Sequence, residues 1–190
     1  MKTILSLITL MLFCLTINAQ NAKEIYSEGK ALYEAKKYKE AFVKFQTAAN
    51  AGNKKAQYYL GRCYDKGRGV TEDDSKAFVW YQKSADQDYA KAQYQLGKCY
   101  KKGEGTEKNV SKAAEYFLKA ATQGNADAQF ELGKCYLKGK GVEQDSLKAK
   151  DLFFQAVNNP KGGEQILKEL KKESSEGDTD AAKILKMIKK

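Results

Sequence analysis

Two columns of side chains recur along the chain at intervals that suit an extended ligand. The first column is aromatic, and the second, four residues later, is basic. Aromatic rings beside lysine and arginine suit an acidic peptide, or a carboxylate held by charge-assisted hydrogen bonds. We therefore predict a partner-binding surface with the candidate residues Tyr26, Lys30, Tyr58, Arg62, Tyr94, Lys98, Phe130 and Lys134.

The same columns have a simpler interpretation. The aromatic rings could pack between helices, and the lysines could be solvated surface residues. One turn before the aromatic column lies a third column, made of Lys23, Lys55, Lys91 and Asp127. We expect these columns to lie on the helix face that points away from the partner helix, where they would line a concave groove.

Catalytic chemistry is poorly represented. The chain of 190 residues contains no histidine, which removes the commonest general base and every histidine metal ligand. A catalytic centre needs unlike residues that converge on one point, whereas a repeat places like residues at equal intervals. We predict a protein that is not an enzyme and that has no cofactor and no metal site.

Three cysteines, Cys63, Cys99 and Cys135, occupy one column with steps of 36 residues. Packed helices lie about 8–10 Å apart, whereas a disulfide needs Cα atoms within about 7 Å. Zinc ligands occur at much shorter spacing. We predict buried, unpaired thiols that act as small hydrophobic groups.

Glycine pairs follow each cysteine: Gly67/Gly69, Gly103/Gly105 and Gly139/Gly141. A phosphate-binding loop would need a preceding strand and a Gly-Lys-Ser/Thr ending, and neither is present. The pairs therefore predict a helix C-cap followed by a turn.

The elements that position these residues follow from the same period. The blocks 56–64, 92–100 and 128–136 repeat one pattern every 36 residues, which indicates a stacked solenoid. Ala56, Leu60 and Tyr64 form an apolar stripe at helical spacing. Glycines inside these helices, at positions 61, 97 and 133, predict close approach of the paired helix.

A second helix follows in each repeat. Its predicted N-cap residues are Asp73, Asn109 and Asp145. In the first copy its predicted buried face is Ala77, Trp80/Tyr81 and Ala85. After Val157 the repeat breaks, and two further helices are expected at about 164–173 and 179–189.

These residues resemble the Sel-1-like repeat family, a longer-turned relative of the tetratricopeptide repeat. The block Ala-x-x-x-Leu-Gly-x-x-Tyr-x-x-Gly-x-Gly-Val matches at 56–70 and 128–142, and at 92–106 with Thr106 in place of valine. Residues 22–52 look more like an ordinary tetratricopeptide unit. The resemblance implies an all-α, right-handed α-solenoid of stacked helical hairpins whose concave surface binds proteins.

The predicted organisation has three parts. Residues 1–19 form a signal peptide and 161–190 a C-terminal helical cap with a polar outer face. Between them, 20–157 hold the tetratricopeptide-like unit (22–52) and three Sel-1-like repeats at about 53–88, 89–124 and 125–160.

The signal peptide is predicted from the apolar run between Ile4 and Ile17. That run is shorter than the roughly 20 residues that cross a bilayer, and it ends at Ala19 before Gln20 in the manner of a cleavage site. We expect an exported protein, periplasmic or secreted, without a stable membrane span after cleavage. An uncleaved anchor is the alternative interpretation of the same run. Export argues against a nucleic-acid partner despite the net charge of +10.

The predicted function is therefore an exported, non-enzymatic adaptor or scaffold that binds a protein or peptide, with an acidic segment as the expected ligand. Two alternatives stay open. One is a cell-envelope hydrolase or penicillin-binding-type enzyme. This activity is suggested for a subfamily of Sel-1-like proteins that carries a disulfide-forming pair of cysteines in every repeat, whereas this chain has one cysteine per repeat. The other is a binder of anionic glycan or lipid head groups.

Overall fold

The computed structural model describes residues 20–189, so the predicted signal peptide at 1–19 lies outside the described residues. The chain divides into two compact units, Met1–Tyr89 and Ala90–Lys190. The described part of the first unit contains helical residues 20–34 followed by α2 (Tyr38–Asn50), α3 (Lys54–Asp65) and α4 (Asp74–Ala85). The second unit contains α5 (Ala90–Lys102), α6 (Val110–Thr122), α7 (Ala126–Lys138), α8 (Ser146–Val157), α9 (Gly163–Ser175) and α10 (Thr179–Ile188).

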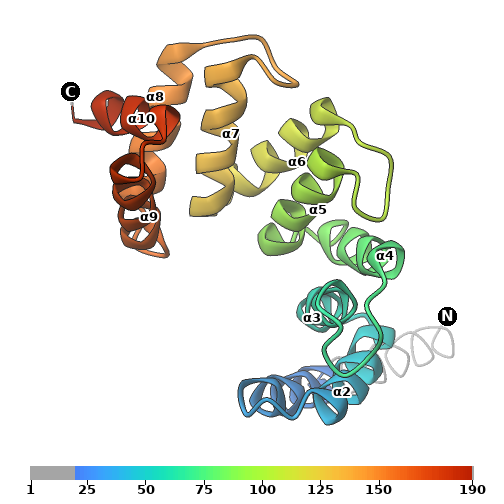
Figure 1. The fold of residues 1–190 in the computed structure, drawn as a ribbon. Helices are drawn as coiled ribbons and strands as arrows, with labels where there is room; N and C mark the ends of the chain where they lie inside the picture. Colours follow the sequence, from blue (N-terminus) through green and yellow to red (C-terminus); the bar gives the residue numbers. More distant parts are fainter. Residues whose placement is uncertain (1–19, 190) are drawn as a thin grey trace, which may run out of the picture. The chain divides into compact units, whose positions relative to one another are not determined.

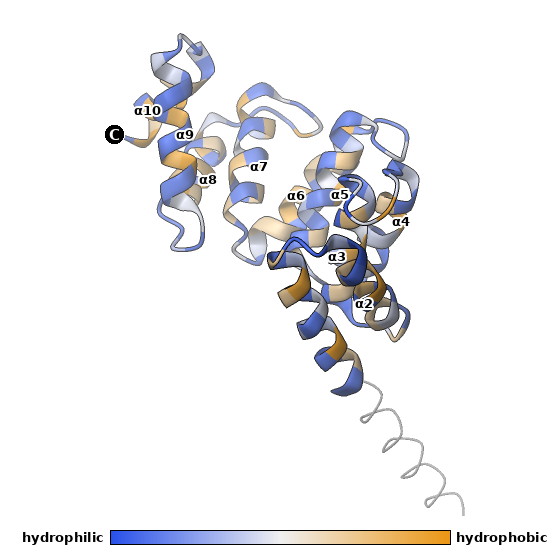
Figure 2. Cartoon of the chain, turned by 60° about the horizontal axis from the view of Figure 1, so that its bottom comes forward, coloured by the Kyte–Doolittle hydropathy of each residue, from blue (hydrophilic) through white to orange (hydrophobic). Residues whose placement is uncertain are grey.

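Consecutive helices pair as hairpins. The pairs α3–α4, α5–α6 and α7–α8 lie side by side, and α9 packs with α10 (Figure 1). Hydrophilic and hydrophobic residues alternate along the labelled helices, as expected for amphipathic helices with one buried face (Figure 2). The predicted all-α fold of helical hairpins is confirmed.

The predicted N-caps begin the second helix of each repeat. The side chains of Asp73, Asn109 and Asp145 accept hydrogen bonds from the backbone N–H groups of Lys76, Lys112 and Lys148. Each cap satisfies a backbone donor that the helix itself leaves without a partner.

The glycines inside the first helices mark the helix crossings, as predicted. A β-carbon on Gly61 would lie 2.7 Å from the ring of Tyr81, and one on Gly133 would lie 2.7 Å from the ring of Phe153. Real β-carbons do not approach other atoms so closely. A large ring from the second helix therefore fills the space that the missing side chain leaves.

The glycine pairs do more than cap and turn. Gly139 is the predicted left-handed C-cap of α7, with φ 62°. The second glycine of the pair, Gly141, brings its backbone against the start of α6, where a β-carbon would lie 2.2 Å from the carbonyl oxygen of Val110. Gly69 contacts the carbonyl of Tyr38 in the same way. The second glycine thus lets the long turn pack on the preceding hairpin.

The core contains most of the predicted residues. Leu60, Leu96 and Leu132 are each at most 1% exposed, which confirms the leucine position of the apolar stripe. Tyr64, the last residue of the predicted stripe, is only half-buried. Trp80 was expected on the buried face of α4, but it is only half-buried, and Lys83 Nζ lies 4.2 Å from its ring centroid. Tyr81, which is 1% exposed, fills the core there.

The two C-terminal helices are confirmed as α9 and α10. Ile166, Leu170 and Ile184 bury their apolar face against the last hairpin. The charged residues on their other faces, including Lys171 and Lys172, are exposed, as expected for a solenoid cap. Among residues 20–189, no helix is both long enough and apolar enough to cross a lipid bilayer.

Candidate functional site

The aromatic column packs inside its own hairpins. Tyr58 lies 6.0 Å from Tyr81 and Tyr94 lies 5.9 Å from Phe117, measured between ring centroids. Tyr26 and Phe130 contact Phe45 and Phe153 in the same manner. The expectation that this column points away from the partner helix is wrong, because each ring reaches across to the large ring that faces the helix glycine.

The basic column lies on these rings in three of its four positions. The guanidinium carbon of Arg62 is 5.9 Å from the Tyr58 centroid. Lys98 Nζ is 5.8 Å from the Tyr94 centroid, and Lys134 Nζ is 4.8 Å from that of Phe130. These are cation–π pairs between residues four apart on one helix. Lys30 instead forms an ion pair with Glu34.

In the first unit, Arg62 lies within a cluster of tyrosines. Its guanidinium carbon is also 5.7 Å from the centroid of Tyr33 and 5.8 Å from that of Tyr59. Tyr58 in turn contacts the ring of Tyr89 at 5.3 Å. Among residues 20–189, Arg62 forms no ion pair. We name this cluster the Tyr–Arg62 surface. It consists of the half-buried Tyr26, Tyr59, Tyr89 and Arg62 together with Tyr58, which is buried beneath them.

Two members of the Tyr–Arg62 surface were missed in the sequence because they do not recur. Tyr59 corresponds to Gln95 one repeat later. Tyr89 stands where Asn53 and Asn125 cap α3 and α7 in the other repeats. Tyrosine cannot replace that cap, and losing an N-cap costs about 1 kcal/mol. A residue that gives up a local stabilising contact is a signal of another role.

Two tyrosines of this surface, Tyr26 and Tyr89, have raised pKa values. Burial, with smaller contributions from the neighbouring Tyr59, Glu34 and Tyr58, raises the pKa of Tyr26 from 10.0 to about 12. Burial also raises the pKa of Tyr89, together with the nearby phenols of Tyr26, Tyr58 and Tyr59. At neutral pH these hydroxyl groups are neutral and remain able to donate hydrogen bonds.

In the second unit the corresponding side chains lie among carboxylates. A cavity of about 190 Å³ is lined by Lys134 and by acidic residues of α7 and α9. The acidic residues are Asp127, Glu131, Glu169 and Glu173. The sequence columns contained only the first of these four, so the predicted basic character does not hold for this part of the second unit.

Cys63 and Cys135 are free thiols, as predicted. Cys63 and Cys99 are also buried as predicted, but Cys135 is only half-buried, so the predicted burial is wrong at that position. Burial raises the pKa of Cys63 to about 12 and also raises the pKa of Cys135. Both thiols therefore stay protonated and weakly nucleophilic at neutral pH. Within the described chain, no three His, Cys, Asp or Glu side chains gather in a way that could hold a metal ion.

Solved structures share this arrangement of helices. A Sel1 repeat protein from Oxalobacter formigenes is 28% identical, with a TM-score of 0.69 over 82% of this chain and 71% of that chain. The protein c5321, described as a protective antigen present in uropathogenic Escherichia coli strains displaying an SLR fold, is also 28% identical. It matches with a TM-score of 0.72, and the match covers 93% of this chain and 40% of the c5321 chain. No curated protein matches the chain.

The family comparison agrees with the repeat boundaries seen in the fold. The Sel1 repeat model matches residues 54–89, 90–125 and 126–159, more than half of the chain. Proteins with this repeat generally mediate protein–protein interactions, and the scaffold is generally non-enzymatic. The hairpins, the helix glycines and this match together establish that the chain belongs to the Sel1 repeat family.

Proposed function

We propose that the protein is an exported, non-enzymatic adaptor that binds an acidic segment of a protein partner at the Tyr–Arg62 surface. The observation that carries the proposal is the packing of tyrosine rings around one guanidinium that has no acidic partner among residues 20–189. The repeat family supplies the expectation of a protein partner.

The chemistry of the surface suits a carboxylate. Arg62 offers a planar set of N–H donors that can hold both oxygens of a carboxylate. The hydroxyl of Tyr89, whose pKa burial raises and the nearby charge of Arg62 lowers in part, adds a protonated donor to the same surface. Half-burial among aromatic rings weakens competition from water and strengthens each of these hydrogen bonds.

The rest of the basic column supports the proposal less. Glu34 already neutralises Lys30. Lys134 lies near Glu131. Burial and Glu169 raise the pKa of the Asp127 carboxyl, and the nearby charge of Lys98 lowers it. We therefore place the acidic segment at Arg62 and not along all four positions of the column.

Export is proposed from the apolar run and the small residue at Ala19. N-terminal sequencing of the protein recovered outside the cytoplasm tests this part. A mature chain that begins at Gln20 supports export, whereas a cytoplasmic protein that retains Met1 or Lys2 contradicts it.

Affinity capture tests the binding function. The tagged protein and its Arg62→Met variant are incubated with envelope extracts, and the captured molecules are identified by mass spectrometry. Lys171→Met removes the same charge from an exposed site on α9 and serves as the matched control. Circular dichroism shows whether each variant keeps its helical content.

We expect a protein that carries an acidic segment to be captured by the wild type and by Lys171→Met, and to be lost with Arg62→Met. Equal capture by all three proteins would overturn the proposal. Capture of glycan or lipid alone, with binding lost steeply as salt increases, would instead support a general binder of anionic surfaces and contradict a protein adaptor.

A further inference from the structure

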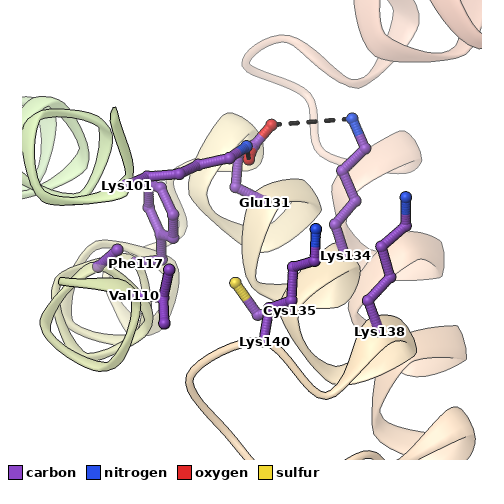
Figure 3. Close-up of a pocket in the computed structure, with 9 residues that line it drawn as sticks. Lys101, Val110, Phe117, Glu131, Lys134, Cys135, Lys138 and Lys140 are labelled. Atoms are coloured by element: carbon purple, nitrogen blue, oxygen red, sulfur yellow. Dashed lines mark hydrogen bonds and ion pairs between the residues drawn. The ribbon is translucent and has the colours of Figure 1, made fainter. Parts of the chain in front are cut away.

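A small apolar cavity opens between α5, α6 and α7 of the second unit. Its volume is about 170 Å³. Its apolar lining comes from Val110, Ala113 and Phe117 of α6 and from Cys135 of α7 (Figure 3). An apolar cavity of roughly 150 Å³ accepts benzene. The cavity, which we name the α6–α7 pocket, therefore has room for one phenyl ring or one branched aliphatic side chain.

Lysines surround this apolar lining. The α6–α7 pocket is lined by four lysines, Lys101, Lys134, Lys138 and Lys140, and by one acidic residue, Glu131. Figure 3 shows these charged side chains around the pocket, with Lys134 facing Glu131. The lining residues therefore carry an excess of positive charge, in contrast to the acidic cavity between α7 and α9.

Internal ion pairs neutralise only part of this charge. Glu131 lies 2.5 Å from Lys101 Nζ and 3.9 Å from Lys134 Nζ, so one carboxylate serves two lysines. Lys138 pairs with Asp180 of α10. Lys140, in the turn after α7, is exposed and forms no ion pair within residues 20–189.

We propose that the α6–α7 pocket binds one apolar side chain of an acidic peptide segment, with the neighbouring carboxylates of that segment held by the surrounding lysines. Two features select this ligand. The volume admits a single side chain, and the charge around the opening complements acidic residues on either side of it. This proposal shares one assumption with the proposed function, namely that the ligand is a segment of a protein.

The pocket contains its own reporter. Cys135 is half-buried, and Figure 3 shows its sulfur directed toward the side of Val110 and Phe117. Burial raises the pKa of its thiol, so alkylation is slow but measurable. Cys63 and Cys99 are more deeply buried, at 0% and 6% exposure. A side chain that occupies the pocket covers the Cys135 sulfur and slows its reaction further.

The test measures the rate at which iodoacetamide alkylates Cys135 in the purified protein, with the site resolved by peptide mass spectrometry. The probe is an acetylated and amidated pentapeptide with a central phenylalanine between pairs of glutamates. One control peptide has alanine at the centre, and another has glutamines in place of the glutamates.

We expect the phenylalanine peptide at saturation to slow alkylation at least about fivefold, as mass action requires when roughly 80% of the sites are occupied. Both control peptides should protect much less. Lys140→Glu should abolish the protection, whereas Lys171→Glu, which makes the same charge change at an exposed site on α9, should keep it.

Absence of protection by the phenylalanine peptide would overturn the proposal, as would equal protection by the alanine peptide or an unchanged effect in Lys140→Glu. If alkylation of Cys135 slows as the protein concentration is raised without any peptide, a second copy of the chain occupies the pocket. That result would also overturn the proposal. Arg62→Met should leave the protection unchanged, so failure of this pocket and failure of the Tyr–Arg62 surface are separate results.

Discussion

The ring of Phe117 lies directly over Gly97, so that a β-carbon on residue 97 would stand 2.5 Å from two of its ring carbons. The ring is fully buried, so an added β-carbon would displace it from its place in the core. Alanine in place of a helical glycine gains about 1 kcal/mol of helix propensity, but overpacking a core costs about 1–3 kcal/mol. The steric cost should exceed the gain at this position.

Gly97→Ala should therefore destabilise the second unit. We predict a lower free energy of unfolding in urea, followed by circular dichroism. The same substitution should cost less in a Phe117→Leu background, where the smaller side chain leaves room. Equal costs in the two backgrounds would show that contact with the ring does not explain the glycine.

A second prediction concerns the start of α6. The side-chain oxygen of Asn109 accepts a hydrogen bond of 2.9 Å from the backbone N–H of Lys112. Asn109→Ala should lower the free energy of unfolding by about 1 kcal/mol, since it leaves that donor without its cap. Asn109→Asp retains an acceptor and should stay close to the wild type. A loss as large in the aspartate variant would contradict a capping role.

A third prediction concerns alkaline pH. The pKa of Tyr26 is raised from 10.0 to about 12, chiefly by burial. The unfolded chain therefore releases this proton before the folded chain does, and stability should fall as pH rises from 10.0 toward about 12. Tyr26→Phe should make that fall less steep.

Spectrophotometric titration of the phenols checks the same assignment. The difference between wild type and Tyr26→Phe should show one tyrosine that ionises near pH 12. A difference curve centred at the ordinary tyrosine pKa would mean that Tyr26 is freely solvated, and would remove it from the Tyr–Arg62 surface.

The repeat made much of the fold predictable. Gly61 and its later equivalents, the N-caps such as Asn109, and the leucine stripe were found because each recurs at one interval and acts within a single hairpin. Local rules for helix starts and close helix packing apply equally to every copy. These predictions depend on short-range geometry, which the sequence pattern carries directly.

The candidate site was less predictable because it depends on departures from the repeat. Tyr59 and Tyr89 have no equivalents in the other copies, so a comparison of columns passes over them. The acidic residues Glu169 and Glu173 reach the column from α9, which lies outside the repeats. The predicted direction of the Tyr58 side chain was wrong. Its ring is long enough to reach Tyr81 of the paired helix, which residue spacing alone does not reveal.

The most direct test of the account uses a synthetic peptide with the sequence of the captured partner's acidic segment. Isothermal titration calorimetry measures its affinity for the wild type and for Arg62→Met. A hydrogen bond to a charged group contributes about 1.5–3 kcal/mol, so we predict roughly 10- to 100-fold weaker binding for Arg62→Met. Lys171→Met should bind as the wild type does. Wild-type affinity in Arg62→Met would contradict the central claim that this guanidinium, among its tyrosines, holds the partner.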